Sequence, residues 1–403
     1  MDRQWQQVSG KLILLGYSSR DLAQSSNLAG LKALSIDYFG DYDSKNTGNN
    51  ISLMRDLQKP FTAKNLAQVA MEQPPGYIVY GGNLENHPSV VRTLATKHRI
   101  LGNDARTLKK ARNLSHISDL LQDSPLQLPA TLLHPANHNK GTVDKVEKSW
   151  LVKNFHSGGG VNVRWYQKGQ HVKKREYLQL HIEGLNLSAT FLADGTQSRL
   201  LGISEQLIGL DEYGSEAFKW SGNVYPWRGE DPATGQNLWH ILSAAAQKLT
   251  QGCGLKGLNT LDFILNKEGI YLLEINPRYS ASMELMERFD SHSLLPAHVA
   301  VCLGDNLAQS IAMLPLGRQE AAHHLTQPEG KTLMKVVLYA KKRIEVEDNQ
   351  AFFQIKAHDI PFKGDIFRKG DPLCTLIREA DSREGCQVEM QEAVKELEPT
   401  LYD

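Results

Sequence analysis

The sequence predicts a mixed α/β protein in which a parallel α/β sheet is combined with antiparallel strands. Three features predict this class. Residues 11–104 alternate strand-like and helix-like segments, residues 258–287 hold two apolar runs joined by a turn, and the chain from Lys331 onward is again strand-like. The first pattern is typical of parallel sheets with crossover helices, and the second is typical of a hairpin.

The length and charge of the chain limit its class further. Its 403 residues are enough for two or three domains with cores of their own. Lysine plus arginine equals aspartate plus glutamate at 45 each, so we expect no nucleic-acid and no membrane partner. The four cysteines lack metal-ligand spacing and no stretch approaches the length of a membrane span, which predicts a cytoplasmic protein with reduced thiols.

The N-terminal residues predict the opening of a parallel sheet. Strands are expected at 12–15, 33–39 and 77–80, with a helix at 20–29 between the first two. The turn after the first strand lacks the glycine pattern of a dinucleotide site, so we expect none there.

Ligands of open α/β sheets bind at the carboxyl ends of the strands, which draws attention to the loop 81–86. Asn83 and Glu85 in this loop are candidates for substrate binding. The alternative is a polar loop that only caps the helix expected from Pro88.

Residues 104–122 predict a basic helix that contains Arg106, Lys109, Lys110 and Arg112. A charged run of this kind is typical of a solvated helix face, and the alternative is that one cation points toward a nucleotide. The sequence leaves both explanations open.

A lysine on a predicted strand precedes a glycine-rich turn. Lys153 lies in the strand 150–153, and residues 157–160 read Ser-Gly-Gly-Gly. Glycines let backbone N–H groups approach a phosphate closely, and the lysine would add a positive charge. The pattern predicts a phosphate-binding flap without a Walker sequence, and the alternative is a mobile hairpin tip.

Residues 177–184 predict a strand that ends in a glycine turn, and a second strand is expected at 187–192. Such a strand end can pair its backbone with the edge of an adenine. The alternative is an ordinary hairpin.

Two apolar runs, 261–265 and 270–275, are joined by Asn-Lys-Glu-Gly and predict a β-hairpin. Each run is interrupted by one carboxylate, Asp262 and Glu274, which paired strands would bring opposite or diagonal to one another.

Asn276 lies on the same strand face as Glu274, and Arg278 follows. Two carboxylates and an amide oxygen suit Mg²⁺ and are a poor set for zinc. Arg278 could neutralise a phosphate or a carboxylate. The alternative is an edge hairpin with solvated acids.

The rest of the chain supplies helices and a β-rich tail. We expect helices at 236–250, 282–289, 294–303 and 388–397, and strands at 332–339, 352–356 and 371–377. No catalytic spacing is found in the tail, which predicts a role in packing or in support of a lid.

The order of four elements, a strand lysine, a glycine-rich flap, a hinge strand ending at Gly184 and an Asp, Glu, Asn-Pro-Arg hairpin, resembles the ATP-grasp superfamily. The tail, with Ile-Pro-Phe-Lys-Gly at 360–364, is similar to the closing segment of biotin-carboxylase-like members. Short segments such as Glu-Ile-Asn-Pro-Arg at 274–278 resemble the predicted ATP-dependent carboligase group. Some members of that group, in methylotrophs, are associated with tetrahydromethanopterin biosynthesis.

This resemblance implies a fold and its divisions. It implies an ATP-grasp fold with an N-terminal Rossmann-like parallel α/β domain, a mobile lid, an antiparallel-sheet core that binds ATP and a small β-rich C-terminal segment. The implied boundaries are 1–104 for the N-terminal domain, 105–320 for the ATP-grasp domain with its lid at about 125–182, and 331–403 for the C-terminal segment.

The resemblance also implies residue roles. Lys153 would hold the nucleotide phosphates and Arg278 would steady the transferred phosphoryl group, so these two are the catalytic candidates. The other implied contacts are phosphates with Ser157, Gly158, Gly159 and Gly160, adenine with Gln179 and Leu180, ribose with Asn186, and Mg²⁺, or alternatively Mn²⁺, with Asp262, Glu274 and Asn276. Many relatives carry a second ATP-binding lysine, for which Arg112 would substitute here.

The implied activity is that of an ADP-forming ligase that joins a small carboxylate to a small amine through an acyl phosphate. The implied pathway is the biosynthesis of a one-carbon carrier such as tetrahydromethanopterin, and a homodimer would be compatible with it. Two alternatives stay open: a biotin-carboxylase-like carboxylating enzyme, and a non-catalytic ATP-binding regulatory protein.

Overall fold

The structure is a computed structural model that describes residues 4–46, 48–133, 149–229, 232–315 and 330–402. Residues 134–148 of the expected lid and 316–320 of the expected central domain lie outside the described residues. Within the described residues, no helix has both the length and the apolar character needed to cross a membrane.

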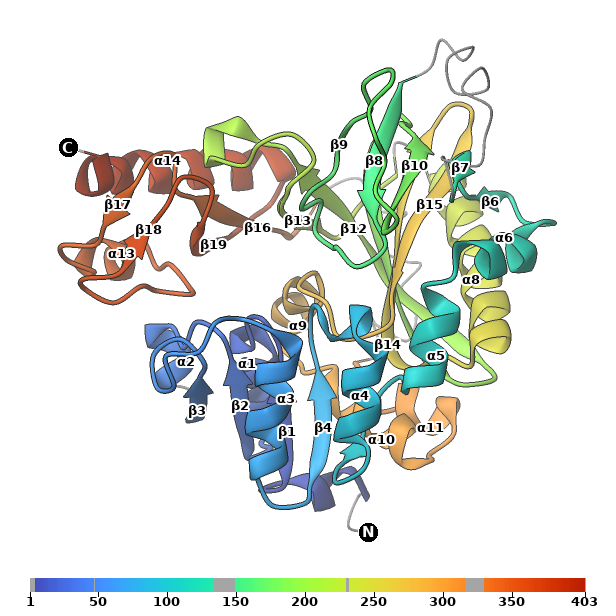
Figure 1. Cartoon of the computed structure of the whole chain (residues 1–403), viewed down its shortest axis with the longest axis horizontal. Coiled ribbons are helices and arrows are strands. Elements are labelled where there is room, and N and C mark those ends of the chain that lie inside the picture. Colours follow the sequence, from blue (N-terminus) through green and yellow to red (C-terminus); the bar gives the residue numbers. More distant parts are fainter. Residues whose placement is uncertain (1–3, 47, 134–148, 230–231, 316–329, 403) are drawn as a thin grey trace.

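Five parallel strands form the N-terminal sheet, in the order β3-β2-β1-β4-β5 (Figure 1). Their bounds are β1 Leu12–Leu15, β2 Ala33–Asp37, β3 Asn49–Ser52, β4 Tyr77–Tyr80 and β5 Arg99–Ile100. The three predicted strands are confirmed, although the second ends at Asp37 rather than at 39. Since β1 pairs with β2 on one side and β4 on the other, the loops after these strands leave the same edge of the sheet.

Helices cover both faces of this sheet. Leu12 and Leu14 of β1 pack with Leu22 of α1, whereas Ile13 and Leu15 pack on the opposite face with α3 and α4. Burial on both faces explains why β1 is a continuous apolar run. The bounds are η1 Gln4–Val8, α1 Arg20–Leu28, α2 Tyr42–Asn46, α3 Ala63–Glu72, η2 Leu84–Asn86 and α4 Pro88–Leu94.

A second sheet forms the core of the molecule, with eight strands in the order β19-β16-β13-β12-β11-β14-β15-β6 (Figure 1). All neighbours are antiparallel except β15 and β6. The bounds are β6 Leu126–Gln127, β11 Leu185–Asp194, β12 Ser198–Ile208, β13 Trp220–Tyr225, β14 Lys256–Asn266, β15 Gly269–Asn276, β16 Thr332–Tyr339 and β19 Pro372–Ala380. Strands β16 and β19 come from the β-rich tail, so the tail extends the central sheet.

The expected lid contains a small antiparallel sheet in the order β7-β10-β8-β9. Its strands are β7 Thr131–Leu132, β8 Trp150–Asn154, β9 Arg164–Trp165 and β10 Glu176–Leu180. Strand β8 thus carries Lys153 at its end, and the glycine-rich turn lies between β8 and β9, as the flap prediction requires.

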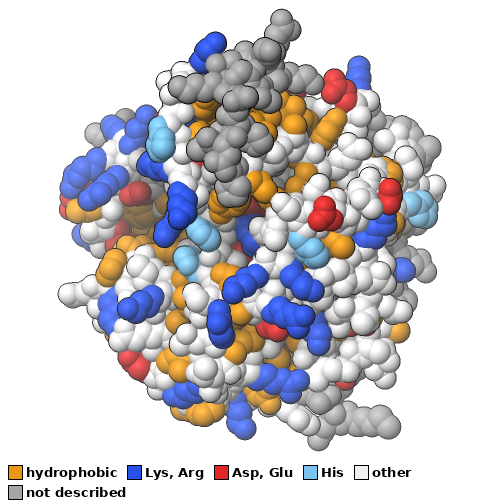
Figure 2. All heavy atoms as spheres, turned by 45° about the vertical axis from the view of Figure 1, so that its right-hand side comes forward, with side chains coloured by type: hydrophobic (Ala, Val, Ile, Leu, Met, Phe, Trp, Pro, Cys, Tyr) orange, Lys and Arg blue, Asp and Glu red, His pale blue; other side chains and the backbone are white. Residues whose placement is uncertain are grey.

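The expected basic helix is two helices, α5 Ala105–Ala111 and α6 Leu114–Leu121. The break falls at Arg112 and Asn113 because the Asn113 side chain accepts a hydrogen bond from the His116 N–H and caps α6. Arg106 and Lys109 are exposed. Figure 2 shows a face of the molecule on which several Lys and Arg side chains gather at the surface. Arg112 is instead turned toward Glu274, so the solvated-face explanation describes Arg106 and Lys109, and a contact of Arg112 with a nucleotide stays a prediction.

The remaining elements complete the core and the tail. Helix α8 packs the apolar face predicted at 236–250 against the central sheet. The bounds are η4 Asp211–Tyr213, α8 Pro232–Cys253, α9 Met283–Asp290, α10 Leu295–Leu303, α11 Leu307–Ile311, β17 Ile344–Glu345, α13 Gln350–Gln354, β18 Ile366–Phe367 and α14 Arg383–Tyr402.

The strand predicted at 352–356 is wrong, because this segment begins inside helix α13. Phe352 and Ile355 are both buried, whereas Phe353 between them is exposed. Burial three residues apart is the helical spacing, which a short apolar run cannot reveal by itself.

One buried histidine joins the N-terminal domain to the central sheet. The His298 side chain on α10 accepts the Leu258 N–H at Nδ1, 2.9 Å away, and its Nε2 lies 3.0 Å from the Leu101 carbonyl oxygen. The second contact requires a proton on Nε2, so both bonds need the neutral ring. Burial lowers the pKa of His298 to about 4.

We therefore expect the neutral His298 ring to contribute stability that is lost as the pH falls from about 6.5 to 4, because the unfolded chain takes up a proton there before the folded chain does. The contribution is on the order of 3 kcal/mol. Urea unfolding near neutral pH and near pH 4 should show a smaller loss for His298→Gln than for the wild type. The exposed His240 supplies the control substitution, and equal acid sensitivity of His298→Gln and the wild type would contradict the expectation.

Candidate functional site

The hairpin of β14 and β15 sets the position of the two acidic side chains. Its turn is Lys267-Glu268, and the Asn266 side chain closes the turn by accepting the N–H groups of Glu268 and Gly269 at 2.9 and 3.1 Å. The pairing that starts at the turn continues to Phe263 and Leu272, and a shift in register after Phe263 then brings Asp262 directly opposite Glu274. The expected juxtaposition of the two carboxylates is confirmed.

Asp262 is held by short side-chain hydrogen bonds. Its Oδ1 accepts the Ser188 hydroxyl at 2.7 Å, and its Oδ2 accepts the Asn276 amide at 2.8 Å. Burial, followed by repulsion from Glu274, raises the pKa of Asp262 to about 6. Two carboxylates held this close have an excess of negative charge that a bound cation would relieve.

Arg278 connects this hairpin to the N-terminal domain. Its Nε lies 2.9 Å from Oε1 of Glu85, and its Nη2 donates to the Asn276 amide oxygen at 3.2 Å. Burial acts to lower the pKa of Arg278, but Glu85, Glu274 and Asp262 outweigh it, so the pKa is raised. Glu85, left open by the sequence, thus contacts the site, whereas Asn83 accepts a hydrogen bond from Asn86.

Lys153 faces the same space from strand β8. Its ammonium donates to Oε1 of Gln179 at 2.7 Å, and Gln179 in turn donates to the Thr131 hydroxyl at 3.1 Å. Burial lowers the pKa of Lys153, which the charge of Glu274 partly opposes. Strands β8 and β10 therefore hold this cation in place through the buried Gln179 side chain.

The glycine-rich turn packs against the loop that precedes β13. The Trp220 N–H donates to the Gly159 carbonyl at 3.1 Å. A Cβ on Gly160 would lie 1.7 Å from the Phe218 carbonyl oxygen, and Gly160 has a φ of +74°, so only glycine fits there. Gly158, by contrast, has no neighbouring atom within 4 Å of an added Cβ.

Arg112 lies behind the acidic pair. Its Nη1 donates to Oε2 of Glu274 at 3.3 Å, its Nη2 donates to the Ser157 carbonyl at 3.2 Å, and it also bonds to the Asn86 side chain. It therefore ties the flap, the hairpin and the N-terminal domain together.

One cavity of about 1060 Å³ collects almost all of the predicted site residues. The exceptions are Arg112 and the two loop candidates Asn83 and Glu85, none of which is in the lining. The predicted residues in the lining are Lys153, Ser157, Gly158, Gly159, Gly160, Gln179, Leu180, Asn186, Asp262, Glu274, Asn276 and Arg278.

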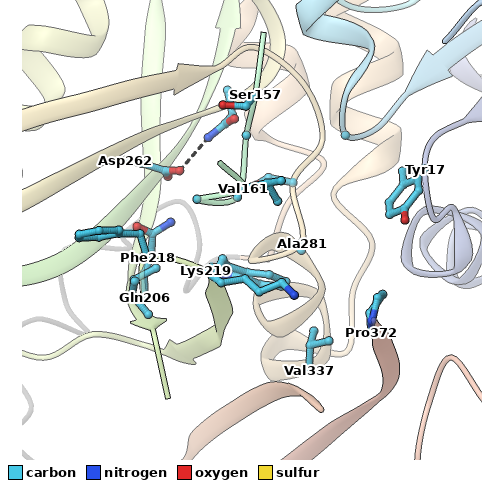
Figure 3. Close-up of a pocket in the computed structure, with 18 of the residues that line it drawn as sticks. Tyr17, Ser157, Val161, Gln206, Phe218, Lys219, Asp262, Ala281, Val337 and Pro372 are labelled. Carbon is cyan, nitrogen blue, oxygen red and sulfur yellow. Dashed lines mark hydrogen bonds between the residues drawn. The ribbon is translucent and has the colours of Figure 1, made fainter. Parts of the chain in front are cut away.

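Other lining residues were not predicted. Gln206 and Asn223 come from β12 and β13 and lie on the wall near Asp262, where Figure 3 shows Gln206 and Phe218 on the same side. The sequence gives no alternating pattern that would have indicated them, because Ser204, Glu205 and Gln206 are three consecutive polar residues of β12. Val337 and Pro372 show that the tail also lines the cavity, which the sequence did not indicate (Figure 3).

Residues 113–282 match the family model of the ATP-grasp domain. The chain contains an ATP-grasp domain. Curated relatives include the uncharacterized protein MJ0776 of Methanocaldococcus jannaschii, which is 21% identical, with 91% of this chain and 88% of the relative covered. The carbamoyl phosphate synthase large chain of Pyrococcus furiosus is 25% identical, with 59% of this chain covered. The chain spans only 23% of the synthase.

Solved structures share the fold over nearly the whole chain. The biotin carboxylase of Campylobacter jejuni is 14% identical with a TM-score of 0.68 and coverage of 96% of this chain and 91% of that one. The N5-carboxyaminoimidazole ribonucleotide synthetase of Thermus thermophilus is 14% identical with a TM-score of 0.61 and coverage of 97% and 99%. The predicted ATP-grasp, biotin-carboxylase-like fold is confirmed.

The close approach of Gly160 to the Phe218 carbonyl gives a test of the flap in this ATP-grasp domain. We expect Gly160→Ala to weaken MgATP binding about tenfold or more, because the methyl group would force the turn away from Phe218. Gly158→Ala, in the same turn, is the matched control and should bind like the wild type. Calorimetric titration, with thermal unfolding as a check on folding, measures both, and equal affinities would contradict the expectation.

Proposed function

We propose that the chain is an ATP-dependent carboxylate–amine ligase. ATP transfers its γ-phosphoryl group to a substrate carboxylate, and an amine attacks the acyl phosphate to give an amide, ADP and phosphate. The observation that carries the proposal is the Asp262–Glu274 pair in one cavity with Lys153, the glycine-rich turn and Arg278. Such chemistry depends on positioning and charge neutralisation, which this set provides.

The donor set suits Mg²⁺. Asp262, Glu274 and Asn276 offer carboxylate and amide oxygens, and the raised pKa of Asp262, which burial and Glu274 cause, indicates a place where a cation would be stabilised. These three residues would hold one or two Mg²⁺, with Mn²⁺ as the alternative. When bound, the metal supplies charge neutralisation at the nucleotide phosphates.

The other residues have separate tasks in this proposal. Lys153 binds the phosphates as a positive charge, and its bond to Gln179 keeps it oriented. The turn 157–160 covers the phosphates and excludes water, which would otherwise hydrolyse an acyl phosphate. Arg278, oriented by Glu85, stabilises the transferred phosphoryl group.

The remaining predicted contacts concern the nucleoside. Gln179 and Leu180 at the end of β10 would meet adenine, and Asn186 at the start of β11 would lie near the ribose. All three line the cavity, which supports this part of the proposal.

The cysteine in the cavity does not suggest covalent catalysis. Cys374 lines the wall, but burial raises the pKa of its thiol well above the ordinary value. A protonated thiol is a poor nucleophile, and direct attack by an amine needs none from the protein.

A second candidate is carboxylation with bicarbonate as the acid. It is favoured by the likeness to biotin carboxylases, which extends over 96% of this chain and thus includes the tail. One of these, from Hydrogenobacter thermophilus, was solved as a dimer with MgADP and bicarbonate, and a homodimer is likewise proposed here. A role in tetrahydromethanopterin biosynthesis rests on the sequence resemblance and stays a prediction.

ADP release from MgATP tests the ligase. With a panel of carboxylates and amines, including pterin and furan precursors, we expect turnover only when one acid and one amine are both present. Glu274→Gln should lower it about a hundredfold or more, since the variant loses a charged ligand and the bond to Arg112. The matched control is Glu268→Gln, an exposed glutamate in the turn of the same hairpin.

The same assay separates the alternatives. Turnover that needs bicarbonate instead of an organic acid would establish carboxylation. Nucleotide binding without turnover under every pairing would contradict both enzymatic proposals and favour an ATP-binding regulatory protein.

A further inference from the structure

The end of the cavity formed by the N-terminal domain has an aromatic wall. Tyr17 follows β1, and Tyr38 and Phe39 follow β2, and all three line the cavity. Figure 3 shows Tyr17 on the opposite side of the cavity from Asp262. This end is therefore separate from the acidic pair that the proposed nucleotide site uses.

The rings of this wall fix one another. The Tyr17 and Tyr38 rings are nearly parallel, with centroids 5.8 Å apart, and the edges of Phe39 and Phe61 meet the Tyr17 ring at 4.7 and 4.4 Å. Even so, Tyr17 keeps 38% of its surface exposed. A large aromatic side chain that is oriented by its neighbours but left uncovered is suited to stacking against a ligand.

A buried carboxyl lies beside the wall. Asp41 is only 8% exposed and lines the cavity, yet no hydrogen bond or ion pair to its carboxyl is found within the described residues. Its acidic neighbours are engaged: Asp37 accepts the Ser19 hydroxyl and the Gly40 N–H, and Asp43 accepts two N–H groups of the tail.

The cation whose charge acts on Asp41, Arg55, is engaged as well. The Arg55 guanidinium makes a two-point contact with Asp365, donates to the Gly40 carbonyl and lies over the Phe362 ring. Burial, together with Asp359, Asp37 and Asp43, raises the pKa of Asp41 well above the ordinary value. A ligand that brings an N–H donor or a positive charge would supply the hydrogen bond or ion pair that this carboxyl lacks.

We propose that this end of the cavity binds one of the two organic substrates by a planar ring that carries an N–H donor or a cationic nitrogen. The ring stacks on Tyr17, and its nitrogen group bonds to Asp41. The reacting end of the substrate then extends along the cavity toward Arg278, which lies against Gly82 of the loop after β4. The inference rests on the proposed ligase, because it assigns a substrate class to the same cavity.

Benzamidine, a planar cation, is the probe, and benzoate and guanidinium supply the ring and the charge separately. Binding is measured by ligand-observed NMR with a non-hydrolysable ATP analogue and Mg²⁺ in excess, so that the nucleotide site is filled. We expect the wild type to bind benzamidine and to discriminate against the other two. Asp41→Asn and Tyr17→Ala should each weaken binding about tenfold or more.

Two control variants are matched to these. Tyr402→Ala removes a partly exposed tyrosine at the end of α14, outside the cavity lining, and Asp56→Asn removes a nearby carboxylate that pairs with Lys45 at the surface. Both should bind benzamidine like the wild type. Thermal unfolding checks each variant, and if Tyr17→Ala fails to fold, the near-isosteric Asp41→Asn carries the test.

Two results would overturn the proposed ring site. Binding of benzamidine that is no tighter than that of benzoate, or that is unchanged in Asp41→Asn, overturns the inference. MgATP binding by the wild type, measured in parallel, separates the two proposals: if it is retained while benzamidine fails to bind, the ligase stands and only the ring site is lost, whereas its absence would overturn the proposed function itself.

Discussion

The register of the β14–β15 hairpin is the constraint on which the site depends. The side chain of Asn266 closes the turn, and a shift in register after Phe263 then places Asp262 opposite Glu274. Without this shift Asp262 would lie opposite Leu273, and Glu274 would point to the other face of the sheet, where α8 packs. The proposed metal ligands thus depend on a turn whose chemistry is visible in the sequence and on a register shift that no local pattern indicates.

A buried ionic network joins the three parts of the chain that form another wall of the cavity. Arg20 on α1 makes two-point contacts with Glu284 on α9 and with Asp359 of the tail, and Lys335 on β16 also pairs with Glu284 at 2.7 Å. Burial acts to raise the pKa of Glu284, but Arg20 and Lys335 outweigh it and hold the pKa well below its ordinary value. Charges buried this deeply are stable only while all partners are present, so the N-terminal domain, α9 and the tail are held together as one wall.

The elements that sequence reasoning recovered are those with local signals. The strand 12–15, the strand 77–80 and the hairpin each have a pattern that their own residues determine. The segment 352–356 failed because a short apolar run has no period long enough to separate strand from helix. The inward turn of Arg112 depends on contacts with residues far away in the sequence, and the lining position of Val337 depends on the pairing of β16 with β13 and β19. No local pattern encodes either of them.

The distinction between local and long-range signals also applies to the two ends of the cavity that the proposed reaction would use. The hairpin places Arg278 by local geometry, but the side chain is oriented by Glu85, which belongs to the loop after β4 of the parallel sheet. Tyr17 and Asp41 belong to the loops after β1 and β2 of that sheet, and β1 is hydrogen-bonded to β2 on one side and to β4 on the other. A substrate held by these loops is therefore positioned by the same strand edge that orients Arg278, so the distance between the bound ring and the phosphoryl group is set by the spacing of adjacent strands.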